Sequence, residues 1–202
     1  MLVLWNLTVI QYISKWFYDF FKRFEGIPAA YIGRKVVHIL GGGITGLLTP
    51  MFFEGNYHII IISAFLLAGY TRFKRSWRPM YWFQVKENSY EVHFALAYGV
   101  VLMLGVVLGD IWVGLIPVLL MSFGDSATGL VRAFTQRRQT KSWDGTFAMF
   151  IVCSVICIWK LGHYGILLAT AASLIERIKT LDDNITVPAV AAILMYLGKF
   201  LF

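Results

Sequence analysis

The chain has 202 residues, of which 58% are hydrophobic and 14% are charged, and its formal net charge is +7. Soluble domains carry about 25% charged residues, so this composition excludes an ordinary soluble protein and predicts a single all-α integral membrane domain over residues 1–202. The positive charge does not indicate nucleic-acid binding, because no nucleic-acid-binding module is visible and basic loops on one membrane face explain the charge more simply.

Hydrophobic runs separated by polar loops predict seven or eight transmembrane or half-membrane helices. We expect them at about 3–20, 36–53, 57–71, 92–109, 111–131, 146–160, 163–178 and 187–202. Several are shorter than the roughly 20 residues that a straight span needs, so some of these helices are expected to be tilted or broken. The first is interrupted by polar residues and either spans the membrane or lies in its interface.

Lysine and arginine are concentrated in every second loop of this pattern. Of the 18 such residues, only Lys160 and Lys199 fall in the other set of loops. Positive loops mark the cytoplasmic face, so we expect the basic loops and any site beside them to be cytoplasmic. The compact chain favours the plasma membrane of a prokaryote, with an archaeon as one candidate source.

The first chemical motif is Gly33-Arg34-Lys35-Val36-Val37-His38, where the second segment begins. Arg34 and His38 are one helical turn apart and share a face. Two adjacent cations and an imidazole at a helix start suit a phosphate or a lipid headgroup. The alternative is an ordinary basic flank with a core histidine.

The second segment also contains a run of glycines. Gly41, Gly42, Gly43 and Gly46 predict close helix packing, or else room for a lipid chain.

The second motif is Ser122-Phe123-Gly124-Asp125-Ser126-Ala127-Thr128-Gly129. An aspartate among small residues, continuing an apolar run, is difficult to explain as solvated surface. The functional interpretation is a Mg²⁺ ligand at Asp125, and the alternative is a helix N-cap.

The third motif runs from Arg137 through Lys141-Ser142-Trp143-Asp144-Gly145 and opens the sixth segment. Lys141 could neutralise phosphate charge, and the Ser142 hydroxyl could donate a hydrogen bond. The alternative is a capped helix start with a basic flank.

The fourth motif extends from Glu176 to Pro188 and contains Asp182, Asp183 and Asn184. Paired carboxylates and an amide between two apolar runs predict a divalent-cation site. The alternative is a helix-to-helix turn closed by Pro188.

All four motifs lie on the same predicted face. Cations for phosphate, carboxylates for Mg²⁺ and a membrane-resident site together indicate phosphoryl or nucleotidyl chemistry on a lipid. The chain has no Walker loop and no protein-kinase signature, so a standard ATP-binding fold is not indicated.

In order and spacing, the motifs resemble those of the CTP-dependent polyprenol kinases, a family that includes dolichol, phytol and CTP-using diacylglycerol kinases and is related to the CDP-diacylglycerol synthases. The resemblance covers about residues 33–190. It implies transfer of the γ-phosphoryl group of CTP to a long-chain isoprenoid alcohol, with Mg²⁺ as cofactor and membrane lipids as surroundings. Oligomeric state is left open.

The resemblance also implies roles for individual residues. Phosphates of the nucleotide would be held by Arg34, Lys35 and Lys141, with nucleotide contacts from Gly124, Gly129, Ser142 and Asp144. Asp125 and Asp183 would hold the metal, with Asp182 as a helper. Asn184 and Glu176 would position their neighbours. The group that takes the alcohol's proton is left open, with Asp125 and His38 as the first candidates.

The chain departs from the family pattern at two positions. Arg132 stands near where the family has a glycine, and Asp144 replaces the usual glutamate of the Lys-Ser-x-Glu-Gly motif.

Two other functions remain open. A cytidylyltransferase making a CDP-lipid would share the stretch from Ser173 to Pro188, although the chain has no acid after Asp183. A small transporter or lipid-binding membrane protein would suit short, broken helices.

Overall fold

Every element in the described part of the chain is helical, which confirms the predicted all-α class. A computed structural model describes residues 2–85, 88–138, 140–178, 180 and 182–201. The N-terminal elements are α1 (Leu2–Thr8), η1 (Val9–Ile13), α2 (Ser14–Phe21), α3 (Ala29–Val36), η2 (Val37–Gly43), α4 (Ile44–Phe52) and α5 (Tyr57–Trp77). The remaining elements are α6 (Tyr90–Val107), α7 (Trp112–Leu119), η3 (Leu120–Gly124), α8 (Asp125–Thr135), α9 (Trp143–Leu161), η4 (Gly162–Tyr164), α10 (Gly165–Glu176) and α11 (Asp183–Leu201).

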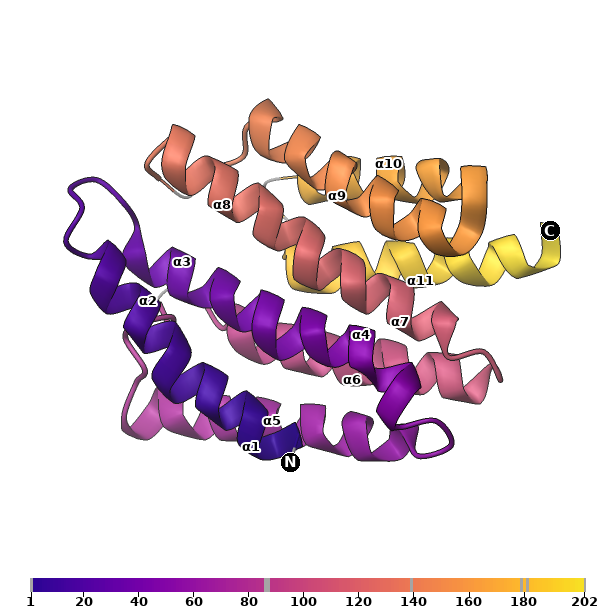
Figure 1. Cartoon of the computed structure of the whole chain (residues 1–202), viewed down its shortest axis with the longest axis horizontal. Helices are drawn as coiled ribbons and strands as arrows, with labels where there is room; N and C mark the ends of the chain where they lie inside the picture. Colours follow the sequence, from indigo (N-terminus) through magenta and orange to yellow (C-terminus); the bar gives the residue numbers. More distant parts are fainter. Residues whose placement is uncertain (1, 86–87, 139, 179, 181, 202) are drawn as a thin grey trace.

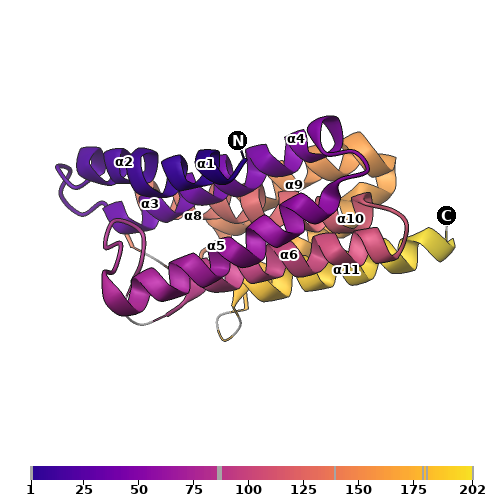
Figure 2. The ribbon, with the colours of Figure 1, turned by 90° about the horizontal axis from the view of Figure 1, so that it is seen from below.

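Several of these elements continue into one another, so the described residues form eight helical rods. The first three elements make one rod, α3 to α4 make the second, and α7 to α8 make another. Each rod overlaps one of the eight expected segments. All of them run roughly along the long axis of the molecule (Figures 1 and 2). At η4 the chain reverses, so that α9 and α10 pack side by side.

The rod from α7 to α8 lies at the centre of the bundle. In an apolar stretch of this rod that is long enough to cross a membrane, 83% of the residues are buried inside the protein. One face packs with α5 and α6 around Leu102 and Leu115, and another packs with α9, α10 and α11 around Met149 and Ala169. Polar groups on this rod are therefore surrounded by protein, and each needs a partner.

Two π-helical segments, η2 and η3, pack against each other inside the bundle. Short π segments within α-helices are frequent at functional sites, because the extra residue per turn leaves backbone groups irregular and redirects side chains. His38 lies in η2 and Asp125 follows η3 directly. The sequence pattern gave no sign of either π segment.

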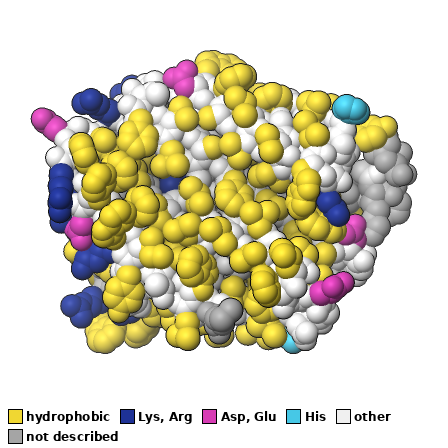
Figure 3. All heavy atoms as spheres, in the orientation of Figure 1, with side chains coloured by type: hydrophobic (Ala, Val, Ile, Leu, Met, Phe, Trp, Pro, Cys, Tyr) yellow, Lys and Arg dark blue, Asp and Glu magenta, His cyan; other side chains and the backbone are white. Residues whose placement is uncertain are grey.

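The outer surface of the bundle is largely hydrophobic, as a membrane protein requires. Leu66, Val107, Phe147 and Leu167 are each more than 60% exposed. Figure 3 shows hydrophobic side chains across the face of the molecule and most of the visible Lys and Arg at one end. Four described stretches are long and apolar enough to cross a membrane: Ala29–Phe52, Tyr90–Val107, Trp112–Thr135 and Trp143–Glu176.

Candidate functional site: a buried cluster of carboxylates and cations

Asp125 is held by the first motif, 90 residues away in sequence. Lys35 Nζ lies 2.7 Å from both carboxylate oxygens of Asp125, and His38 Nδ1 lies 3.0 Å from Oδ2. All three side chains are buried. The His38 ring also stacks on Phe94, with ring centroids 3.9 Å apart. The first two motifs therefore form one site across the contact between η2 and η3.

Glu176 joins the third and fourth motifs. It accepts a bidentate pair from Arg132, with Nη1–Oε1 at 2.7 Å and Nη2–Oε2 at 3.1 Å. Lys141 Nζ donates to Glu176 Oε1 at 2.8 Å and also pairs with Asp183. Glu176 is fully buried, and its contacts with these two cations offset the cost of removing a carboxylate from water.

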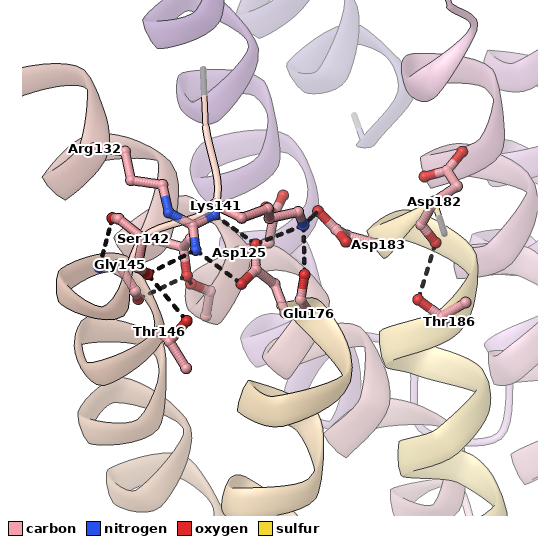
Figure 4. Close-up of polar contacts among 12 residues, drawn as sticks. Asp125, Arg132, Lys141, Ser142, Gly145, Thr146, Glu176, Asp182, Asp183 and Thr186 are labelled. Atoms are coloured by element: carbon pink, nitrogen blue, oxygen red, sulfur yellow. Dashed lines mark hydrogen bonds and ion pairs between the residues drawn. The ribbon is translucent and has the colours of Figure 1, made fainter. Parts of the chain in front are cut away.

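Together these contacts bring three carboxylates into one cluster. Ligand oxygens of Asp125, Glu176 and Asp183 all lie within 4.8 Å of one another. Figure 4 shows Lys141 reaching between Glu176 and Asp183, with Asp125 beside them. Three cations, Lys35, Lys141 and Arg132, balance the three carboxylates in formal charge. We refer to these six residues as the charge cluster.

The charge on Lys141 is stabilised by its carboxylate neighbours. Burial disfavours the ammonium, but the charges of Glu176 and Asp183 outweigh burial and raise the pKa of Lys141 above its usual value. Lys141 is therefore fully protonated at neutral pH and can compensate phosphate charge.

Unpartnered oxygens make the cluster suitable for a divalent cation. Asp183 Oδ1 and Asn184 Oδ1 are buried and have no hydrogen-bond partner among the described residues. Hard cations such as Mg²⁺ prefer carboxylate and amide oxygens, and they keep several waters or phosphate oxygens as further ligands. Asp125, Glu176 and Asp183 could therefore supply oxygen ligands to a hard divalent cation.

Arg34 is buried between two aromatic rings rather than exposed on the basic flank. Its guanidinium carbon lies 5.2 Å from the ring centroids of both Tyr31 and Tyr90. Nη1 is buried and has no hydrogen-bond partner in the described part of the chain. The guanidinium thus keeps an unused donor.

Asp182 lies apart from the charge cluster, in contrast to the expectation that it helps to bind metal. Its carboxylate pairs with His93 of α6 and accepts hydrogen bonds from the backbone and side chain of Asn184. In Figure 4 it points away from Lys141 and Glu176. It joins α6 to the start of α11.

Gly124 and Gly129, which the resemblance assigns to nucleotide contacts, lie where neighbouring side chains approach the helix closely. A side chain at Gly129 would overlap the stem of Lys35, and one at Gly124 would lie against Cys153 and Met149 of α9. Gly129 therefore lets Lys35 pass close to α8 and reach Asp125. Close packing is confirmed for Gly42 too, where a side chain would meet Phe94 and Ser122.

The third motif both caps a helix and borders the site. Ser142 is the N-cap of α9, and its hydroxyl oxygen accepts a hydrogen bond from the Gly145 amide at 3.5 Å. Its carbonyl accepts from Arg132 Nη2 at 3.1 Å. Asp144 is exposed and lies outside the cluster, where it accepts a weak hydrogen bond from Gln136.

Two of the structural alternatives are wrong. Asp125 is no N-cap, because the helix runs unbroken from α7 through η3 into α8. Pro188 does not close the turn after Glu176, because α11 begins at Asp183 and Pro188 lies inside it. Neither residue is explained by helix termination, so Asp125 in particular has no purely local reason to be buried.

Sequence reasoning did not predict the ion pair of Arg132 with Glu176, and it did not identify Glu91 as a buried, paired carboxylate. In the sequence Arg132 is only a departure from an expected glycine, whereas in the structure it is the buried partner of Glu176. Glu91, in the first turn of α6, is buried and pairs with Arg75 and Gln84. An acid near the start of an apolar run is the signal that could have identified Glu91.

Comparison with known proteins adds no family assignment: the chain matches no protein-family model, no curated protein and no solved structure.

Proposed function

We propose that the protein is a CTP-dependent lipid kinase that transfers the γ-phosphoryl group of CTP to a long-chain isoprenoid alcohol. The observation that carries the proposal is the convergence of three carboxylates with Lys35 and Lys141 in a buried site of a membrane protein. Phosphoryl transfer needs mainly positioning and charge neutralisation, and this set of groups supplies both. The motif resemblance to the polyprenol kinases supports the nucleotide and the acceptor.

The charge cluster suggests an exchange of partners when substrate binds. Asp125, Glu176 and Asp183 would hold the Mg²⁺ ion, which would supply positive charge for the phosphates of CTP. Lys35 and Lys141, which pair with the same carboxylates, would then bind phosphate. Arg132 stays with Glu176 and keeps that carboxylate in place.

His38 is the group best placed to take the alcohol's proton. Its Nδ1 faces Asp125, and its Nε2 is buried without a partner among the described residues. As the alcohol oxygen bonds to the γ-phosphorus, its proton passes to Nε2 and the bond from the γ-phosphorus to the bridging oxygen breaks. CDP leaves, and the proton returns to solvent, which balances the reaction.

Replacing Lys141 with alanine is expected to raise KM for CTP about 10- to 100-fold, because a charge-assisted hydrogen bond contributes roughly 1.5–3 kcal/mol. Steady-state kinetics at saturating alcohol measure the change. Lys160→Ala, at the far end of α9, is the matched control and should leave KM unchanged. An unchanged KM for CTP in Lys141→Ala would remove this residue from the nucleotide site.

We further propose that the basic end of the bundle is cytoplasmic. A cysteine at exposed Ser76 should react with a membrane-impermeant maleimide only after the cells are opened, whereas one at exposed His163 should react in intact cells. The native Cys153 and Cys157 are free and buried, so the unmodified chain provides the background. Labelling of the Ser76 position in intact cells would contradict this orientation.

The overall activity is tested by CTP consumption in detergent. Addition of a long-chain isoprenoid alcohol should stimulate release of CDP, and chelation of Mg²⁺ should abolish it. Release of CDP that does not depend on the alcohol, or that persists with excess chelator, would contradict the proposal.

A further inference from the structure

A cavity lies between the N-terminal rod, η2, α5 and α6, on the side of His38 away from the charge cluster. Its walls include Ile10, Val37, Leu67 and Phe94, and their side chains are mostly apolar. The free space is about 60 Å³. At roughly 10–15 Å³ for each water-sized group, this holds about five such groups.

Unsatisfied polar atoms are concentrated around this cavity. Arg34 Nη1, His38 Nε2, Thr45 Oγ1 and Glu91 Oε2 are all buried without a hydrogen-bond partner in the described residues, and all four residues line it. Leaving a buried polar group unpaired costs about 1–3 kcal/mol, so four such atoms in one cavity indicate a ligand with polar atoms. A purely apolar occupant would leave them unpaired.

The polar and apolar walls follow the direction of the rods. Successive turns of the second rod contribute Arg34, His38 and then Gly41 and Gly42, while α6 contributes Glu91 and then Phe94. The charged groups therefore lie at one end, and the lining beyond them is mostly apolar, with the Thr45 hydroxyl as a polar group there. An amphiphile with a short polar head and a hydrocarbon chain matches this order.

We propose that this cavity binds the hydroxyl end of the lipid acceptor, taking the alcohol group and about one five-carbon isoprenoid unit. Glu91 Oε2 or Arg34 would orient the hydroxyl group, and Phe94 and Leu67 would contact the first carbons. His38 lines the cavity and contacts Asp125 through Nδ1, so a hydroxyl group beside Nε2 would be separated from the charge cluster by the imidazole ring alone. This inference rests on the proposed kinase function and assigns its acceptor site.

The test is photolabelling of the purified protein in detergent without nucleotide. The probe is a 20-carbon isoprenoid alcohol carrying a diazirine on its first isoprenoid unit. We expect adducts in peptides from the second rod and α6, competed by the unlabelled alcohol and not by the hydrocarbon of the same length. Adducts confined to the outer faces of α9 and α10 would overturn the assignment.

Variants that fill the cavity sharpen the test. Ala95→Phe on α6 and Ser63→Leu on α5 should each reduce competed labelling at least tenfold and raise KM for the alcohol, with KM for CTP unchanged. Leu96→Phe, the adjacent exposed residue on α6, is the matched control and should label normally. Wild-type labelling in both folded filling variants would contradict the proposal.

Labelling and transfer can fail separately. Competed labelling of the cavity together with transfer from the α-phosphate of CTP would uphold an alcohol site and reject the kinase. Confirmed γ-phosphoryl transfer with no cavity labelling would uphold the kinase and reject this acceptor site.

Discussion

Replacement of Asp125 by asparagine will lower the rate of phosphoryl transfer by on the order of a thousandfold or more. A loss of this size is among the largest that follow removal of one preorganised electrostatic group from an active site. Asp125 contacts Lys35 and His38 and contributes one of the three carboxylates of the charge cluster. Asparagine keeps the shape of the side chain but removes the charge. Metal binding, the position of Lys35 and the orientation of His38 should all be affected.

The measurement is turnover at saturating CTP and alcohol, alongside thermal unfolding in the same detergent. Asp19→Asn is the control, because Asp19 forms an exposed pair with Lys22 and lies outside the cluster. Its turnover should equal that of the wild type. Turnover within a few-fold of wild type in a folded Asp125→Asn protein would remove this residue from the catalytic centre.

The largest stability effect is expected at Arg132. Replacement by methionine leaves the fully buried Glu176 with Lys141 as its remaining cation, and breaking a buried ion pair in this way costs about 3–5 kcal/mol. Replacing both partners, as Arg132→Met with Glu176→Gln, should cost less than the sum of the single changes, because the unpaired charge is also removed. Catalysis should not recover in the double variant.

Unfolding monitored by denaturant titration in detergent gives the free energies for this comparison. Arg72→Met is the matched control, since Arg72 is exposed and its hydrogen bond to Ser76 is on the surface, so its effect should stay within about 0.5 kcal/mol. A loss below about 1 kcal/mol for Arg132→Met would show that Glu176 is not held by this pair.

Sequence reasoning predicted most of the fold, because hydrophobic runs of membrane length leave few alternatives to helices. It placed each of the eight rods and selected Asp125, Glu176 and Asp183, which the structure brings together. Helical periodicity did pair Arg34 with His38 on one face, and both line the same cavity.

What sequence could not supply is which face of each helix meets which neighbour. Asp182 and Asp183 are adjacent, yet one pairs with His93 of α6 and the other with Lys141. That separation depends on where α11 begins and how it is rotated, which composition does not determine. The π segments that redirect His38 and Asp125, and the long-range pairing of Arg132 with Glu176, depend on the same tertiary packing.

The central claim is tested most directly by following the α-phosphate and the γ-phosphate of CTP separately. Purified protein is incubated with Mg²⁺, a mixture of isoprenoid alcohols and phosphatidate, and CTP labelled at either the α- or the γ-phosphate. A lipid kinase predicts γ-label in an alcohol-derived monophosphate, with CDP released and no α-label in lipid. Label from the α-phosphate in lipid, with pyrophosphate released, would contradict the kinase and establish a CDP-lipid synthase instead.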